Sequence, residues 1–200
     1  KSVLEIQIEK LKSFGFNEIY LATNYKSDYI ESFFGDGSRY GVKIKISKEK
    51  IRLGTAGPLL LLKDKLKEPF LVMNGDILSL IDYKKFYNYA VNSDSLLTLS
   101  VKKEVTPYQF GNILFDGDYV KKIEEKPDII MYILAGIYVM KPEIFKFFPK
   151  DKYFGMDNLI THLLDKKYKI SKYEIMEYWL DIGRLSDYER AQDDYTKYFK

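Results

Sequence analysis

The sequence predicts an α/β fold with a Rossmann-like mixed, mainly parallel sheet flanked by helices, and with an antiparallel β elaboration in its second half. Helical and strand patterns alternate through residues 1–95, which is typical of parallel strands joined by helices. After residue 105, short alternating strands and turns replace this pattern. A chain of 200 residues with 46% apolar side chains is long enough to bury one sizeable core, so we expect a single domain over residues 1–200.

The first half is predicted to alternate helices with buried strands. Leu4, Ile8 and Leu11 repeat at helical spacing, and Gly15 follows at a position where glycine commonly ends a helix. Pro58 lies in the first turn of a further helix, directly after a glycine-bearing loop. The other expected elements are helices over 29–34 and 83–91 and strands over 19–22, 42–46, 70–73 and 96–101.

The second half is predicted to begin with a β-hairpin. Strands over 111–115 and 119–124 flank a turn at residues 116–118. Ser186 and Glu189 have the spacing of a capping box, which predicts a last helix that ends near residue 199. Between the hairpin and this helix we expect a strand over 133–140, helices near 142–148 and 156–166, and strands over 169–175 and 177–181.

The composition excludes several function classes. The absence of cysteine removes disulfides, thiolate metal sites and cysteine nucleophiles, and a single histidine, His162, leaves little room for a Ser-His-Asp triad. The net charge of +3 comes from interspersed charges, so we expect no nucleic-acid partner. No apolar run is long enough to span a bilayer, and no secretory signal begins the chain, so we expect no membrane partner and a cytoplasmic protein.

The loop from Leu53 to Leu59 could approach a ligand closely. Its glycines, Gly54 and Gly57, let the backbone come near a planar group, and the helix that follows offers unpaired N–H groups. The alternative interpretation is an ordinary turn in which glycine and proline only mark the helix start.

Two aspartates follow predicted strands. Asn74-Gly75-Asp76 ends a buried strand, where ligands bind in open α/β sheets and where a carboxylate could hold Mg²⁺ against phosphates. Asp181 follows the only tryptophan, Trp179. The alternatives are a simple turn at 74–76, and a core tryptophan with an aspartate that starts the last turn. The two carboxylates form a metal site only if the fold brings them together.

Glu125 and Lys126 end the second hairpin strand. Lys126 could meet a phosphate as a point charge, and Glu125 could accept hydrogen bonds from sugar hydroxyls. A solvated strand end is the alternative interpretation. His162 lies in an apolar helical pattern and is interpreted as a packing residue.

The order of these motifs strongly resembles that of the sugar-1-phosphate nucleotidyltransferases, over nearly the whole chain. The matching segments are LGTAGPL at 53–59, FLVMNGD at 70–76, EKP at 125–127, AGIYV at 135–139 and WLDIG at 179–183. The first segment is most similar to the mannose-1-phosphate guanylyltransferase branch. The resemblance implies the nucleotide-diphospho-sugar transferase fold, and it implies transfer of a nucleotidyl group from an NTP, with GTP favoured, to a sugar 1-phosphate, which gives an NDP-sugar and pyrophosphate.

The resemblance also implies the roles of individual residues. Asp76 and Asp181 would hold Mg²⁺ and, with Lys126, serve catalysis. Residues 1–103 would form the nucleotide-binding half, and residues 104–200 the sugar-binding half. The implied nucleotide-binding residues are Leu53, Gly54, Thr55, Gly57, Asn74 and Gly75, and the implied sugar-binding residues are Gly111, Glu125, Lys126, Ala135 and Gly136.

The sequence departs from the family pattern in two places. The family's first strand and its G-G-x-G-x-R loop do not occur, so we expect a chain that lacks about 25–30 residues at its N-terminus, judged from ordinary domain sizes. Leu134 stands where the family usually has asparagine. Both departures leave open a second hypothesis, a non-catalytic sugar-nucleotide-binding or regulatory module of the same fold. Because relatives often associate, a homo-oligomer is also compatible with the sequence.

Overall fold

A computed structural model describes residues 1–150 and 152–199. It begins with a helix and a parallel strand pair, as predicted. The pair is formed by β1 (Glu18–Thr23) and β2 (Lys43–Lys48), which run parallel in register from Glu18 opposite Lys43. Helices α1 (Val3–Ser13) and α2 (Ser27–Phe34) pack against the pair. Gly15, just after the end of α1, has a positive φ of 91°.

The central sheet has four strands in the order β3 (Phe70–Met73), β8 (Asp128–Met140), β5 (Leu97–Pro107) and β9 (Ser171–Glu174). Only β5 and β9 are parallel, whereas β8 runs antiparallel to both β3 and β5. The fold is therefore the predicted mixed α/β fold with a larger antiparallel share than the helix–strand alternation indicates. The reason is that β8 returns from the second half of the chain and inserts between two strands of the first half.

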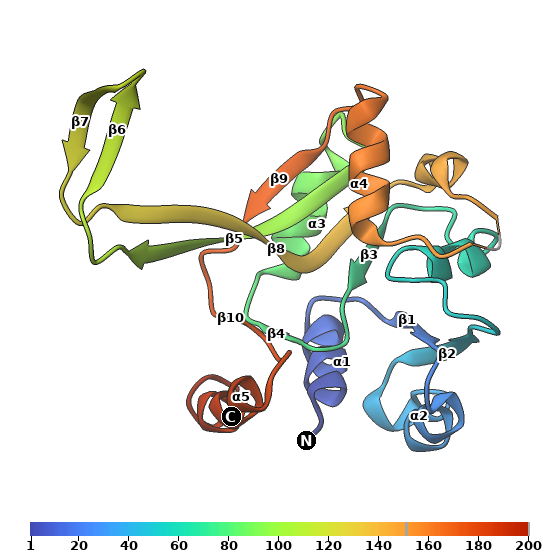
Figure 1. Ribbon diagram of the computed structural model, residues 1–200. Coiled ribbons are helices and arrows are strands. Elements are labelled where there is room, and N and C mark those ends of the chain that lie inside the picture. The colour runs from blue at the N-terminus through green and yellow to red at the C-terminus, as the bar shows by residue number, and fades with distance from the viewer. Residues whose placement is uncertain (151, 200) are drawn as a thin grey trace.

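Helices cover both faces of this sheet. Successive side chains of β8 point to opposite faces, so alternate residues of β8 contact different helices. Tyr138 and Met140 join a core cluster with α4 (Met156–Asp165), whereas Ile137 and Val139 join another with α3 (Tyr83–Val91). Figure 1 shows α3 and α4 on either side of the strands. None of the described helices is long and apolar enough to cross a bilayer.

Strands β5 and β8 continue beyond the sheet as a two-stranded arm. The arm carries the predicted hairpin, β6 (Asn112–Asp116) and β7 (Tyr119–Glu124), at its far end (Figure 1). Both long strands exceed the predicted ranges, and their outer parts pair as far as Pro107 opposite Asp128.

A second small strand pair was not predicted as such. Strand β4 (Ile77–Ser79) pairs antiparallel with β10 (Trp179–Asp181), and both pack between α1 and the last helix, α5 (Leu185–Tyr198). Ser186 lies inside α5, so the capping-box prediction is wrong in its residues. The backbone N–H of Arg184 donates to the Asp187 carboxylate at 2.9 Å, and this bond stabilises the helix start instead.

Three short segments are 3₁₀ helices. Two of them, η2 (Gly57–Leu62) after the glycine loop and η3 (Pro142–Phe147), were expected as ordinary helices. The third, η1 (Ser38–Tyr40), lies in the connection before β2. Short connecting segments commonly take this tighter form. His162 on α4 packs edge-on against Phe147, in keeping with its interpretation as a packing residue.

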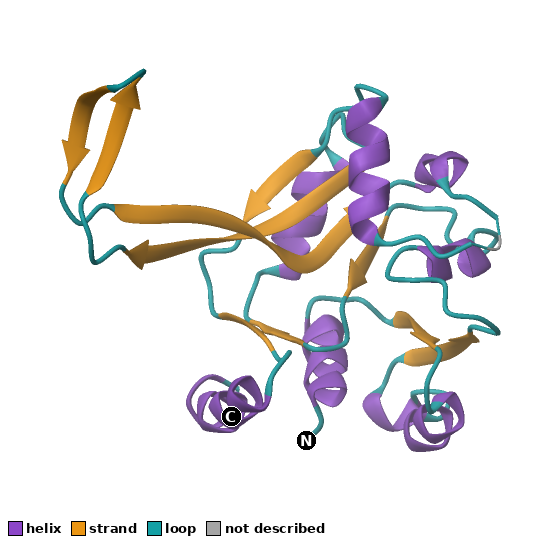
Figure 2. Cartoon of the chain, in the orientation of Figure 1, coloured by secondary structure: helices purple, strands orange, loops and turns teal. Residues whose placement is uncertain are grey.

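Strands β1 and β3 point the same way, although they do not pair. Phe16, just before β1, packs against Tyr87, and the Tyr87 hydroxyl donates to the carbonyl of Pro69, just before β3. At the other end, the Gln7 side chain of α1 reaches the carbonyl of Asn74, just after β3. Because α1 runs back along β1, the strands are parallel, and Figure 2 shows them in separate sheets.

Between β1 and β3 lies a cavity of about 780 Å³. Its walls include both strands and the apolar faces of α1 and η2. Thr23, at the end of β1, is buried, and its hydroxyl has no hydrogen-bond partner among the described residues. Each of the two strands therefore has one edge that faces this cavity without a backbone partner in the described chain.

Candidate active site

The β4–β10 pair brings the two predicted carboxylates together. Asp181 lies opposite Ile77 in this pair, and the backbone N–H of Ile182 donates to the carbonyl of Asp76 at 3.0 Å. Partial desolvation of its carboxylate, and then the negative charges of Asp76 and Asp187, raise the pKa of Asp181 above the usual aspartate range. The two carboxylates are thus close enough to repel each other.

This arrangement fits a divalent cation. Carboxylate oxygens are ligands that Mg²⁺ prefers, and the neighbouring charges that perturb Asp181 are both negative. Within the described residues, no group of three or more His, Cys, Asp or Glu side chains could hold a metal ion. A cation at Asp76 and Asp181 would therefore take its other ligands from water and from phosphate oxygens, as Mg²⁺ commonly does in phosphoryl-transfer sites.

The turn that carries Asp76 is joined to β8. The backbone N–H of Asn74 donates to the carbonyl of Gly136 at 2.9 Å. Gly136 has a φ of 69°, and a Cβ atom built on it would lie 2.9 Å from the side-chain amide nitrogen of Asn74. The structure thereby places one predicted nucleotide-binding residue against one predicted sugar-binding residue.

Strand β10 is fixed by two contacts that the sequence did not reveal. The indole N–H of Trp179 donates to the carbonyl of Ala135 at 2.8 Å. The Lys102 ammonium donates to the carbonyls of Ile175 and Glu177, in the segment that leads into β10. Ala135 itself is fully buried in the core, so its side chain faces β4 and α3 rather than solvent.

The glycine loop is held by the segment before α4. The carbonyl of Leu53 accepts from the backbone N–H of Phe154 at 2.7 Å, and the N–H groups of Ala56 and Gly57 donate to the Phe154 carbonyl. Gly54 has a φ of 88°, and a Cβ atom there would lie 2.7 Å from the same carbonyl oxygen. The loop therefore needs glycine at this position for close backbone packing.

Four of the six predicted nucleotide-binding residues line the cavity between β1 and β3. Leu53 and Gly57 are buried within the loop instead. The four lining residues are Gly54 and Thr55, in the glycine loop, and Asn74 and Gly75, directly after β3. Asn74 and Gly75 therefore lie at the carboxyl end of a strand, where open α/β sheets bind ligands.

Thr55 has a structural contact as well. Its hydroxyl oxygen accepts a hydrogen bond from the backbone N–H of Met156 at 2.8 Å, in the first turn of α4. This N–H has no partner within its own helix, so Thr55 acts as a cap from outside.

We expect Thr55→Val to lower the free energy of unfolding by about 1 kcal/mol, because it removes this cap without changing the side-chain volume greatly. Urea denaturation measures the change, and Thr55→Ser, which keeps the hydroxyl, serves as the control. An equal free energy of unfolding for the valine variant and the wild-type protein would contradict the capping role.

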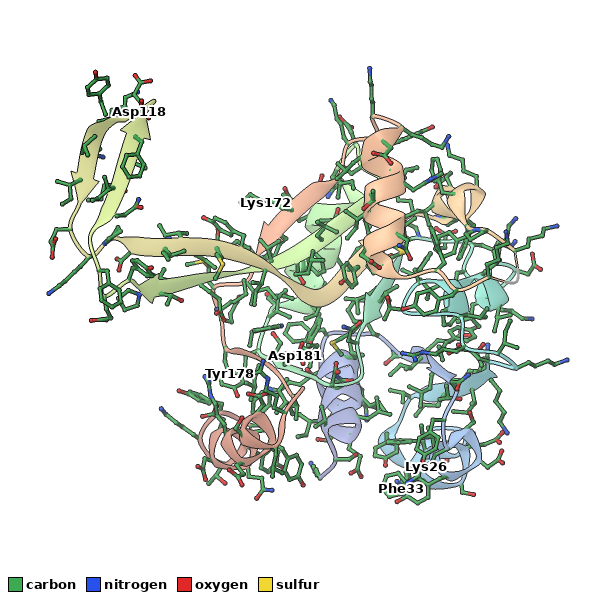
Figure 3. All side chains as sticks on the ribbon, in the orientation of Figure 1. Lys26, Phe33, Asp118, Lys172, Tyr178 and Asp181 are labelled. Carbon is green, nitrogen blue, oxygen red and sulfur yellow. The ribbon has the colours of Figure 1, made fainter. Side chains whose placement is uncertain are left out.

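The remaining sugar-binding candidates lie on the arm. A Cβ atom on Gly111 would lie 3.3 Å from the Glu125 carboxylate, so these two residues meet at the base of the hairpin. Lys126 follows with a φ of 43°, which is uncommon for a residue with a side chain. Figure 3 shows Asp118, at the hairpin tip, well apart from Asp181 at the β4–β10 pair. The structure brings Gly111 and Glu125 together at the base of the hairpin, and Figure 1 shows this hairpin at the end of the arm, away from the β4–β10 pair.

Comparison with known proteins gives a consistent family. Residues 1–198 match the protein family described as "Nucleotidyl transferase". A rice protein (Oryza sativa subsp. japonica) named "Probable mannose-1-phosphate guanylyltransferase 3" is 31% identical over 94% of this chain and 54% of its own length. A protein named mannose-1-phosphate guanylyltransferase catalytic subunit beta from Danio rerio is 28% identical with the same coverage. The chain therefore spans about half the length of the curated relatives it matches.

Solved structures give the same fold. The crystal structure of HddC from Yersinia pseudotuberculosis matches with a TM-score of 0.73 and 28% identity, over 96% of this chain and 84% of HddC. A second HddC structure, in complex with GMP-PN, matches with a TM-score of 0.72 and 27% identity, over the same shares of the two chains.

Proposed function

This chain belongs to the nucleotidyl transferase family, and from that premise we propose that the protein transfers a nucleotidyl group from an NTP to a sugar 1-phosphate, with GTP as the favoured donor. The products are an NDP-sugar and pyrophosphate. The relatives named as mannose-1-phosphate guanylyltransferases and the GMP-PN complex of HddC support guanine as the base. This chain covers 54% of the length of the rice relative, so the activity of the whole protein is a proposal.

The observation that carries the proposal is the β4–β10 pair, which sets Asp76 beside Asp181 at one end of the fold. A pair of neighbouring carboxylates is costly without a cation, because each raises the energy of the other's charged form. Partial desolvation of its carboxylate, and then this repulsion, raise the pKa of Asp181. A bound Mg²⁺ would neutralise phosphate charge during the transfer.

The rest of the reaction requires positioning more than acid–base chemistry. An oxygen of the sugar phosphate attacks the α-phosphorus and forms a new P–O bond, while the bond from the α-phosphorus to the bridging oxygen breaks and pyrophosphate leaves with that electron pair. No protein group needs to accept a proton from a phosphate dianion. We assign Gly54, Thr55, Asn74 and Gly75 to the nucleotide, because they all line the cavity between β1 and β3.

We assign the sugar to the second half of the chain. Gly136 adjoins the nucleotide residues through Asn74, and Gly111, Glu125 and Lys126 approach from the arm.

We expect Lys126→Ala to raise the KM for the sugar 1-phosphate about tenfold, because it removes a cation that pairs with phosphate. Initial rates at varied sugar phosphate and at varied NTP measure the two KM values, and the KM for the NTP should stay nearly constant. Lys121→Ala, at an exposed lysine of neighbouring β7, is the control. A sugar-phosphate KM equal to that of the control would remove Lys126 from the site.

The test of the function is pyrophosphate release by the complete gene product in the presence of Mg²⁺. GTP, ATP, CTP, UTP and dTTP are each paired with mannose 1-phosphate and with glucose 1-phosphate. Release that needs both substrates and is fastest with GTP supports the proposal. Calorimetric binding of GDP-mannose without any pyrophosphate release would favour the sugar-nucleotide-binding module instead.

A further inference from the structure

Gln7 is a polar residue on the apolar face of α1. It occupies the same stripe as Leu4, Ile8 and Leu11, at the spacing that places all four side chains toward the protein interior. Only 5% of Gln7 is exposed to solvent. A buried amide is costly unless it is hydrogen-bonded, so its partners indicate what it does.

The Gln7 amide nitrogen has two partners, which lie on either side of Asp76. It donates to the carbonyl of Asn74 at 3.0 Å and to the carbonyl of Ile77 at 2.7 Å. Because both partners only accept hydrogen bonds, the nitrogen rather than the oxygen of the amide must face the turn. Gln7 therefore closes the two ends of the segment that contains Gly75 and Asp76.

Two other bonds hold the same segment from different elements. Gly136 on β8 accepts from the N–H of Asn74, and the N–H of Ile182, just after β10, donates to the carbonyl of Asp76. These bonds fix the turn from the sheet and from the strand pair. Gln7 supplies the contact from α1. Its contact is made by a side chain, whereas the contacts of Gly136 and Ile182 are made by backbone groups.

We propose that Gln7 is a positioning residue that holds Asp76 beside Asp181 in the geometry needed for a divalent cation. The inference rests on the proposed function for its catalytic consequence. The contact itself is independent of that function. Residues that hydrogen-bond to metal ligands, or to the backbone that carries them, fix the orientation of those ligands. Removal of such a residue commonly lowers metal affinity or activity about 10- to 100-fold.

The test is Gln7→Met, which keeps the length of the side chain and removes both donors. We expect kcat to fall about 10- to 100-fold with little change in either substrate KM, together with a matching rise in the Mg²⁺ concentration needed for half-maximal rate. Two further readouts need no turnover. Amide hydrogen exchange at residues 75–77 should become faster, and Mn²⁺ affinity, followed by electron paramagnetic resonance, should fall.

The matched control is Ile8→Val, at the next residue of the same helix. Ile8 is fully buried and packs with Leu21 and Phe34, on the side of β1 and β2. We expect this variant to lose some stability while exchange at 75–77 and Mn²⁺ affinity remain as in the unchanged protein. Gln7→Lys, which restores a donor, should recover part of the protection at 75–77.

The outcomes separate this inference from the proposed function. Unchanged exchange at 75–77 and unchanged Mn²⁺ affinity in Gln7→Met would overturn the positioning role, whatever the enzyme does. Absence of pyrophosphate release in the unchanged protein would overturn the function. Faster exchange in Gln7→Met, with the control unchanged, would still support the role of Gln7 in holding the turn.

Discussion

Asp181→Asn is expected to abolish most turnover and at the same time to stabilise the metal-free fold. Loss of one charge from the proposed cation site should lower kcat by about a hundredfold or more, the usual effect of removing one group that stabilises transition-state charge. Partial desolvation, and then repulsion from Asp76 and Asp187, raise the pKa of Asp181, and the asparagine has no charge to suffer either effect. Catalytic groups often lower stability in this way.

The sign of the stability effect depends on pH. An acid whose pKa is higher in the folded state than in the unfolded state destabilises the fold when both states are ionised. We therefore expect Asp181→Asn to raise the free energy of unfolding at pH 7. The gain should shrink as the pH falls through the raised pKa, and it should vanish below the unfolded aspartate pKa of about 3.9.

Urea denaturation without metal at pH 7 and at pH 3, together with pyrophosphate release, checks both effects. Asp76→Asn should lose turnover to a similar extent. Asp187→Asn is the control, because it also removes a negative charge near Asp181 and keeps an oxygen that can accept from the Arg184 N–H. It should cause no large loss of turnover, although it weakens the charge-assisted hydrogen bond at the start of α5. Normal turnover in both Asp76→Asn and Asp181→Asn would refute the cation site.

Gly54→Ala is expected to be strongly destabilising. The φ of 88° is strained for any residue with a Cβ atom, and that atom would lie 2.7 Å from the Phe154 carbonyl oxygen and 2.9 Å from its carbon. These are backbone atoms, which cannot rotate away as a side chain can. Left-handed strain and overpacking together should lower the free energy of unfolding by about 2–4 kcal/mol.

Gly75→Ala is a suitable comparison for Gly54→Ala. A Cβ atom on Gly75 meets nothing within 4 Å in the described chain, and its φ lies outside the strained region. We expect its stability to change little. Equal thermal unfolding of the two alanine variants would show that the loop at 53–57 can move away from residues 152–155, contrary to the close packing described above.

The sequence predicted most elements because their patterns are local. Helix α1 has a regular apolar stripe and a glycine at its end, and the hairpin has its turn between two alternating runs. Strand β4 was missed because three residues are too few to show a period. The antiparallel position of β8 was missed because strand order depends on contacts between residues far apart in the chain.

The candidate site was predicted in part for the same reason. Asp76 and Asp181 each end a strand pattern, but only the pairing of β4 with β10 shows that they meet. Ser186 was expected to cap α5 because its spacing to Glu189 is typical, whereas Asp187 is the residue that accepts the bond. Gln7 gave one local signal, a polar residue within an apolar stripe, and its partners became visible only in three dimensions.

The unpaired edges of β1 and β3 also affect how this chain behaves at high concentration. Two parallel edges with free N–H and C=O groups, beside an apolar cavity, form a template for an extended segment of another molecule. Edge-to-edge pairing of this kind leads to aggregation, which natural sheets avoid by covering their edges. We therefore expect residues 1–200 to aggregate as the protein concentration rises. Lysine substitutions on the free edges of β1 and β3 should reduce this aggregation.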